Sequence, residues 1–183
     1  MLVFFLPFTP SPQNMPNPKI TIELSKADKL IEIISWITLI FVWVTIVMNY
    51  SALPDTIPVH FGASGEPYSY GNKATIIILG FVMTFVFGMM SLLNRVPHIF
   101  NYPVKITPEN ARYQYTLATK LIRYINLSVV FLITFIIIMT MKIAHGEADG
   151  LGVWSLVTFM LIVFGPIANY FYKSFRASKT APK

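Results

Sequence analysis

The chain alternates between long apolar windows and short polar connections. Four windows, residues 33–50, 74–94, 124–141 and 151–172, contain no Lys, Arg, Asp or Glu. Crossing the hydrocarbon core of a bilayer takes about 20 apolar residues as a helix. None of the windows has the alternating pattern of a barrel strand, so their backbone groups must be satisfied within helices. The pattern predicts an all-α, polytopic membrane protein, a bundle of four transmembrane helices within residues 25–172.

Composition and charge agree with this fold class and add an orientation. The chain is 55% hydrophobic and 12% charged, with a mean hydropathy of +0.61. Of its 14 Lys and Arg residues, 12 lie before the first window, between the second and third, or after the fourth. Positive residues flank the cytoplasmic ends of spans. We therefore expect both termini and a basic tail, 173–183, on the cytoplasmic side of the cytoplasmic (inner) membrane. The lipid bilayer accounts for the basic charge, and no nucleic-acid partner is expected.

The helix ends carry recognisable signals. Ser25 and Asp28 predict a capped start for the first helix. Thr107, Pro108 and Glu109 predict the start of the third. This third helix has no Gly or Pro before Gly146, so it would be about 50 Å long and would project into the cytoplasm. Residues 1–24 are expected to form a flexible or interface-lying tail. The alternative is an over-called start, with Met15 as the real initiator.

Polar and small residues within the windows suggest how the helices pack. Gly80, Thr84 and Gly88 recur every four residues, so they share one helix face that a neighbouring helix can approach closely. A helix of the same chain is the expected partner, and a homodimer seam is the alternative. Asn126 lies towards a window end, like Asn49 and Asn169, where we expect water to reach.

The connection 53–73 is polar and rich in turn residues. Prolines at 54 and 58 fix two backbone angles. Gly65-Glu66-Pro67 and Tyr70-Gly71-Asn72 are both turn signals. The segment therefore predicts a structured, stiff extracytoplasmic loop between helices 1 and 2, with aromatic residues packed on the bundle.

The same connection carries a family resemblance. Its motif consists of Leu53, Pro54, Ile57, Pro58, His60, Phe61, Gly65, Pro67 and Lys73. A second stretch contains Asn101, Tyr102, Pro103 and Asn110. Together these resemble the membrane domain of unknown function 1648, which also forms the N-terminal part of SdpI-type immunity proteins. The resemblance implies a multi-pass protein of the bacterial inner membrane. It also implies immunity to a secreted peptide and signalling, with the first motif as the recognition loop and the second as a cytoplasmic motif.

No catalytic, cofactor or nucleotide motif is found, so we expect neither an enzyme nor a cofactor. An outer metal site is conceivable but matches no known ligand spacing, and no metal is expected. Its candidate ligands are Asp55, His60, Glu66, His145, Glu147 and Asp149. For His60 we favour a hydrogen bond from the ring to a backbone carbonyl, with pH sensing as the alternative. No ionisable residue lies in the core of a window, which argues against a transporter acting alone.

Two functions therefore remain open. In the first, loop 53–73 recognises an extracytoplasmic peptide or membrane-protein partner. In the second, the chain is a small structural or accessory subunit of a larger membrane complex or transporter, and uses the face that carries Gly80 and Gly88.

Overall fold

The computed structural model describes residues 17–180, so the predictions for residues 1–16, including a start at Met15, and for residues 181–183 lie outside it. The described chain runs α1 (Lys26–Asn49), η1 (Tyr50–Ala52), β1 (Thr56–Phe61), β2 (Pro67–Asn72), α2 (Ala74–Leu93), η2 (Pro97–Ile99), α3 (Ala111–Ala144) and α4 (Ser155–Thr180). Within it, four helices are long and apolar enough to cross a membrane. The predicted fold class is confirmed, with a two-stranded antiparallel sheet added to the helices.

Local hydrogen bonds determine where α1 and α3 begin, and α3 begins later than predicted. The Ser25 hydroxyl accepts a hydrogen bond from the Asp28 amide at 3.2 Å, and the Asp28 carboxylate accepts one from the Ser25 amide at 2.9 Å. This reciprocal capping box confirms the predicted start. α3 begins at Ala111 rather than Pro108, because Thr107 to Asn110 form a separate turn. The Asn110 side chain accepts the Thr107 amide at 2.9 Å and so holds that turn.

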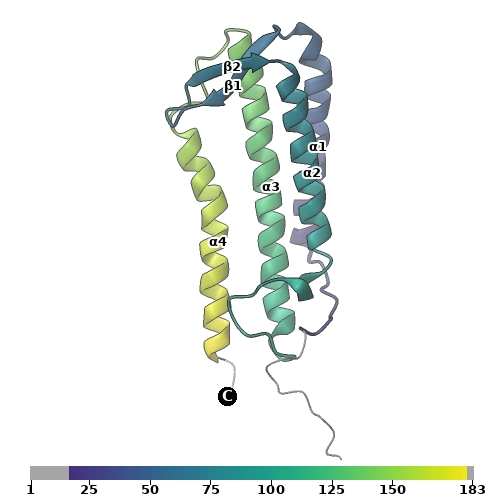
Figure 1. The fold of residues 1–183 in the computed structure, drawn as a ribbon. Coiled ribbons are helices and arrows are strands. Elements are labelled where there is room, and N and C mark those ends of the chain that lie inside the picture. The colour runs from purple at the N-terminus through teal and green to yellow at the C-terminus, as the bar shows by residue number, and fades with distance from the viewer. Residues whose placement is uncertain (1–16, 181–183) are drawn as a thin grey trace, which may run out of the picture.

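α3 is the central helix of the bundle (Figure 1). Its 34 residues extend over about 51 Å. α1, α2 and α4 each pack on it, and α4 continues through residues 173–180, the first part of the predicted basic tail. The hairpin of β1 and β2 covers one end of the bundle, the hairpin end. The described chain begins and ends at the opposite end, the terminal end.

The core consists of aliphatic residues between α1, α2 and α3. Val42, Met83, Val130 and Ile137 are each fully buried. By contrast, many large apolar residues on the outer helix faces are exposed, among them Val47 and Leu161. An apolar exterior around an apolar core is typical of a helical bundle whose surroundings are lipid. The molecule is a multi-pass membrane protein.

The stripe on α2 is used inside the chain. A Cβ added at Gly80 would lie 3.1–3.2 Å from the Ile46 and Trp43 side chains of α1. The Trp43 indole donates a hydrogen bond to the Thr84 hydroxyl at 2.9 Å. Gly88 has no such neighbour within 4 Å. Two of the three stripe residues therefore contact α1 of the same chain.

Candidate functional site

The polar connection between α1 and α2 folds as a β-hairpin. Thr56 pairs with Asn72, Ile57 with Gly71 and Phe61 with Pro67, and the register shifts around His60. Tyr70-Gly71-Asn72 is therefore part of a strand and not the turn that its residue types predict. Gly71 fits there because Val59 of the opposite strand lies only 3.1 Å from where its Cβ would be.

Lys73 fixes the base of the hairpin. Its ammonium group donates to the Leu53 carbonyl at 3.1 Å, pairs with Asp55 at 3.1 Å and lies 5.5 Å from the centre of the Tyr50 ring. The Asp55 side chain is 91% exposed, so this ion pair contributes little. The bond to the carbonyl joins the two ends of the loop. Lys73 thus closes the base of the hairpin, and it does not line the groove described below.

The turn of the hairpin is attached to the α3–α4 connection through glycines. Gly65 has a φ of 86°, and its carbonyl accepts a hydrogen bond from the Leu151 amide at 2.7 Å. A Cβ at Gly65 would lie 2.9 Å from the Gly152 carbonyl oxygen, and one at Gly150 would lie 2.6 Å from the Gly65 oxygen. Only residues without a side chain allow this approach. We call these contacts between the two loops the glycine clasp.

Beneath the hairpin lies a groove of about 480 Å³, the hairpin groove. Its roof is formed by Ile57, Pro58, Val59, His60, Phe61, Gly62 and Gly65. Its walls are Thr75, Ile76 and Leu79 of α2, Leu132, Ile136 and Thr140 of α3, and Leu151, Ser155, Leu156 and Phe159 before and within α4. Most of these side chains are aliphatic or aromatic. The groove therefore suits an apolar ligand segment with few polar groups.

The structure brings some of the predicted loop residues to this groove and separates others. Pro58, His60, Phe61 and Gly65 line it. Pro54 is exposed in the segment that leads into β1. Pro67 is half-buried opposite Phe61 and does not line the groove.

His60 does not have the environment we favoured. Its side chain is exposed and stacks on the Tyr68 ring at 6.0 Å between centroids. Among the described residues, no hydrogen bond from its ring to a carbonyl is found. Nor does the described chain bring three or more potential ligands together at a metal site. No three of the six candidate ligands come together in the described chain.

The second motif folds the connection before α3. The Tyr102 hydroxyl donates to the Pro97 carbonyl at 2.8 Å, and its ring stacks on Tyr115 at 5.3 Å. Burial, together with the neighbouring Tyr115 hydroxyl, raises the pKa of Tyr102. The Asn110 amide donates to the Lys105 carbonyl at 2.9 Å. Asn101 is exposed and Pro103 half-buried, and both belong to the same connection.

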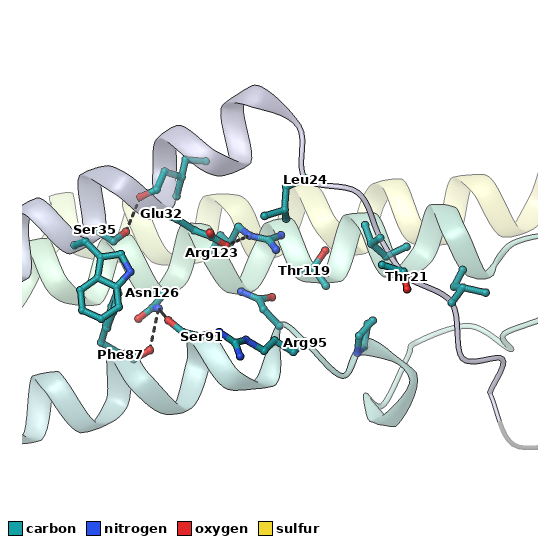
Figure 2. Close-up of a pocket in the computed structure, with 16 residues that line it drawn as sticks. Thr21, Leu24, Glu32, Ser35, Phe87, Ser91, Arg95, Thr119, Arg123 and Asn126 are labelled. Carbon is teal, nitrogen blue, oxygen red and sulfur yellow. Dashed lines mark hydrogen bonds and ion pairs between the residues drawn. The ribbon is translucent and has the colours of Figure 1, made fainter.

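Sequence reasoning missed a polar cluster at the terminal end. The Arg123 guanidinium donates to the Glu32 carboxylate at 2.7 Å, and only 7% of the Arg123 side chain is exposed. Asn126 is 5% exposed, and its amide donates to the Phe87 carbonyl and the Ser91 hydroxyl (Figure 2). In the sequence, Arg123 contributes only to the Lys and Arg distribution that predicts the orientation in the membrane. Its position one residue before an apolar window was the available signal.

Fold and groove together define a four-helix membrane protein with a hairpin-covered groove at one end. Residues 37–86 match the family model described as domain of unknown function (DUF1648), which confirms the resemblance to that domain. The match covers residues 37–49 of α1, the hairpin and residues 74–86 of α2. It thus includes the motif of loop 53–73, whereas the second stretch, with Asn101, Tyr102, Pro103 and Asn110, lies outside the match.

The chain is also similar to part of a curated archaeal protein. An "uncharacterized protein" of Archaeoglobus fulgidus is 31% identical over 88 residues, covering 44% of this chain and 48% of that protein. The chain thus spans about half the length of the curated relative it matches. No solved structure matches the chain.

Proposed function

We propose that the protein recognises an extracytoplasmic peptide or a membrane-protein partner through the hairpin groove, and that it has no catalytic activity of its own. The observation that carries this proposal is the position of β1. Pro58, His60 and Phe61, all residues of the family motif, line an apolar groove closed above by the glycine clasp. A stiff roof keeps such a groove formed before binding, which lowers the entropic cost of association.

The chemistry of the walls indicates the class of ligand. Apolar walls gain most from burying an apolar segment, so the ligand we propose is a peptide or partner helix with an apolar face. A secreted peptide toxin, the ligand implied by the resemblance to SdpI-type proteins, would belong to this class. The proposal places the hairpin end outside the cytoplasmic membrane and both termini inside, as the Lys and Arg distribution predicts.

Filling the groove tests this function. Ile136 lines the groove, whereas Phe131 on the same helix is 48% exposed on the outer surface. A strain lacking the protein would be complemented with wild type, Ile136→Trp or Phe131→Trp and challenged with secreted peptide from a producing strain. We expect wild type and Phe131→Trp to restore growth and Ile136→Trp to fail at equal membrane abundance. Equal protection by both variants would contradict the proposal.

A chemical readout accompanies the growth assay. A photo-reactive phenylalanine would replace Phe159, which lines the groove, or Phe164, which is 58% exposed on the outer face of α4. We expect a peptide adduct from position 159 that Ile136→Trp removes, and none from position 164. Lipid adducts alone at both positions would mean that the groove holds acyl chains.

The second function, an accessory subunit of a larger complex, has weaker support. Gly80 and Thr84 already contact α1 of the same chain, which leaves Gly88 as the open position of the stripe. If a partner or second copy packs there, Gly88→Leu should remove it from mild-detergent preparations.

A further inference from the structure

A second cavity, also of about 480 Å³, lies at the terminal end and is unrelated to the hairpin groove. We call it the terminal cavity. Side chains of α1 and α2 form its two sides, and Thr119, Arg123 and Asn126 of α3 form its back (Figure 2). Residues 20–24, which precede α1, close part of it. The proposed function makes no use of this cavity.

The cavity lies at the level where the apolar windows end. Glu32 immediately precedes the first apolar window, Arg95 follows the second and Arg123 precedes the third. Trp36, which also lines the cavity, is 53% exposed on the outer surface of the bundle. Tryptophan at a window end is typical of the membrane interface, where lipid headgroups lie. The cavity therefore faces the headgroup layer at this end.

The charges of the cavity favour an anion. Arg95 is exposed and makes no ion pair among the described residues, and Arg123 bonds Glu32 through Nε. Within residues 17–180 the Nη groups of Arg123 make no hydrogen bond to the protein. Two guanidinium groups against one carboxylate leave a net positive site. Guanidinium groups bind phosphate oxygens with charge-assisted hydrogen bonds.

The cavity also contains acceptors that need a donor. The side-chain oxygens of Asn94 and Asn126 are buried, and neither has a hydrogen-bond partner in the described chain. The Asn126 amide nitrogen is held by the Phe87 carbonyl at 3.3 Å and the Ser91 hydroxyl at 3.2 Å, which fixes the direction of its oxygen. Buried acceptors are normally satisfied, so a group with hydroxyl or ammonium hydrogens is expected here.

We propose that the terminal cavity binds the headgroup of a phospholipid from the adjacent leaflet. The phosphate lies against Arg95 and Arg123, and the hydroxyl or ammonium group of the headgroup donates to Asn94 and Asn126. Basic pockets between transmembrane helices bind lipid headgroups in this manner. A phosphate headgroup that also carries an ammonium group or hydroxyls can bind the two arginines and donate to the two asparagine oxygens. A simple anion can bind only the arginines.

Lipid binding can be measured by native mass spectrometry after reconstitution with phosphatidylglycerol, phosphatidylethanolamine and phosphatidylcholine. Arg95→Gln removes the exposed guanidinium, and Arg112→Gln removes another exposed one, from α3 outside the cavity. We expect one retained phosphatidylglycerol or phosphatidylethanolamine, weaker binding of phosphatidylcholine, which lacks donors, and about a tenfold loss in Arg95→Gln only. Equal losses in both variants, or equal retention of all three lipids, would overturn the assignment.

Asn94→Leu separates a binding role from a structural one. It removes a buried acceptor without a partner, so the delipidated protein should become more stable to heat while its stabilisation by added lipid becomes smaller. Unchanged stabilisation by lipid would contradict the proposal. Soluble glycerol phosphate serves as the control for the source of the phosphate. If it binds as tightly as the lipid, the ligand is a soluble phosphate ester and the lipid proposal fails.

Discussion

The glycine clasp makes the sharpest prediction about the hairpin groove. In Gly65→Ala the new side chain would have to adopt a φ of 86°, which costs an L-residue about 1–2 kcal/mol. Its Cβ would also lie 2.9 Å from the Gly152 oxygen, so the two loops must separate. Separation breaks the bond from the Leu151 amide to the Gly65 carbonyl, worth about 1 kcal/mol. The expected total is about 2–3 kcal/mol of lost stability at this end of the bundle.

The assay compares matched glycine variants of the same loop. Gly62 has no positive φ, and a Cβ there would have contacts of 3.8–4.0 Å, which is ordinary packing. Gly62→Ala should therefore change the free energy of unfolding by less than about 1 kcal/mol. Gly150→Ala approaches the same contact from the other side, since its Cβ would lie 2.6 Å from the Gly65 oxygen. It should also separate the two loops and break the bond from the Leu151 amide, but without the cost of a positive φ.

Hydrogen exchange of the Leu151 amide in detergent micelles reports the clasp directly. We expect this amide to lose protection in Gly65→Ala and in Gly150→Ala, and to keep it in Gly62→Ala. Thermal unfolding of the three variants gives the accompanying stability change. If all three variants kept the Leu151 protection of the wild type, the clasp would not hold the roof of the groove, and the reasoning would be refuted.

Three further predictions concern the rest of the bundle. Gly80→Leu should destabilise the protein by about 1–3 kcal/mol, because α1 leaves no room for a side chain. Gly88→Leu should be close to neutral in the monomer, because nothing lies within 4 Å of its Cβ position. Unfolding curves in detergent distinguish the two variants. The buried Ser174 hydroxyl donates a hydrogen bond to the Gln114 side-chain oxygen at 2.6 Å. Gln114→Leu removes this acceptor, so the free energy of unfolding should fall by about 1–3 kcal/mol. In a double-mutant cycle, adding Ser174→Ala should recover part of that loss. Because the chain has no cysteine, Ser64→Cys gives a single thiol at the hairpin turn. An impermeant thiol reagent should label this thiol in intact cells. Protection from labelling would reverse the predicted orientation.

Local signals in the sequence were sufficient for the helical framework. Ser25 and Asp28 are three residues apart, so their capping box is visible without knowing the fold. The length of α3 follows from the absence of Gly and Pro between Ala111 and Ala144. The number of spans follows in the same way, because the transfer of an apolar window into lipid depends on that window's own composition. The first residue of α3 was misplaced, because of the competing turn at Thr107.

The site depends on contacts between residues far apart in the sequence. Gly65 and Leu151 meet across the top of the bundle, and Arg123 reaches Glu32 from a position 91 residues away. The residues around Gly71 are those of a turn, yet Gly71 lies in β2 and packs against Val59 of β1. The local sequence alone does not distinguish these two positions.

The sequence by itself determined that this is a membrane bundle of four helices with a structured connection between the first two, because hydrophobicity, capping and helix length are properties of contiguous segments. The tertiary structure alone decided that the connection is a clasped hairpin over an apolar groove, and that Arg123 and Asn126 face a polar cavity at the other end. Both sites are assembled from at least three elements. Their geometry therefore depends on how the helices pack around α3, which residue types along the chain do not specify.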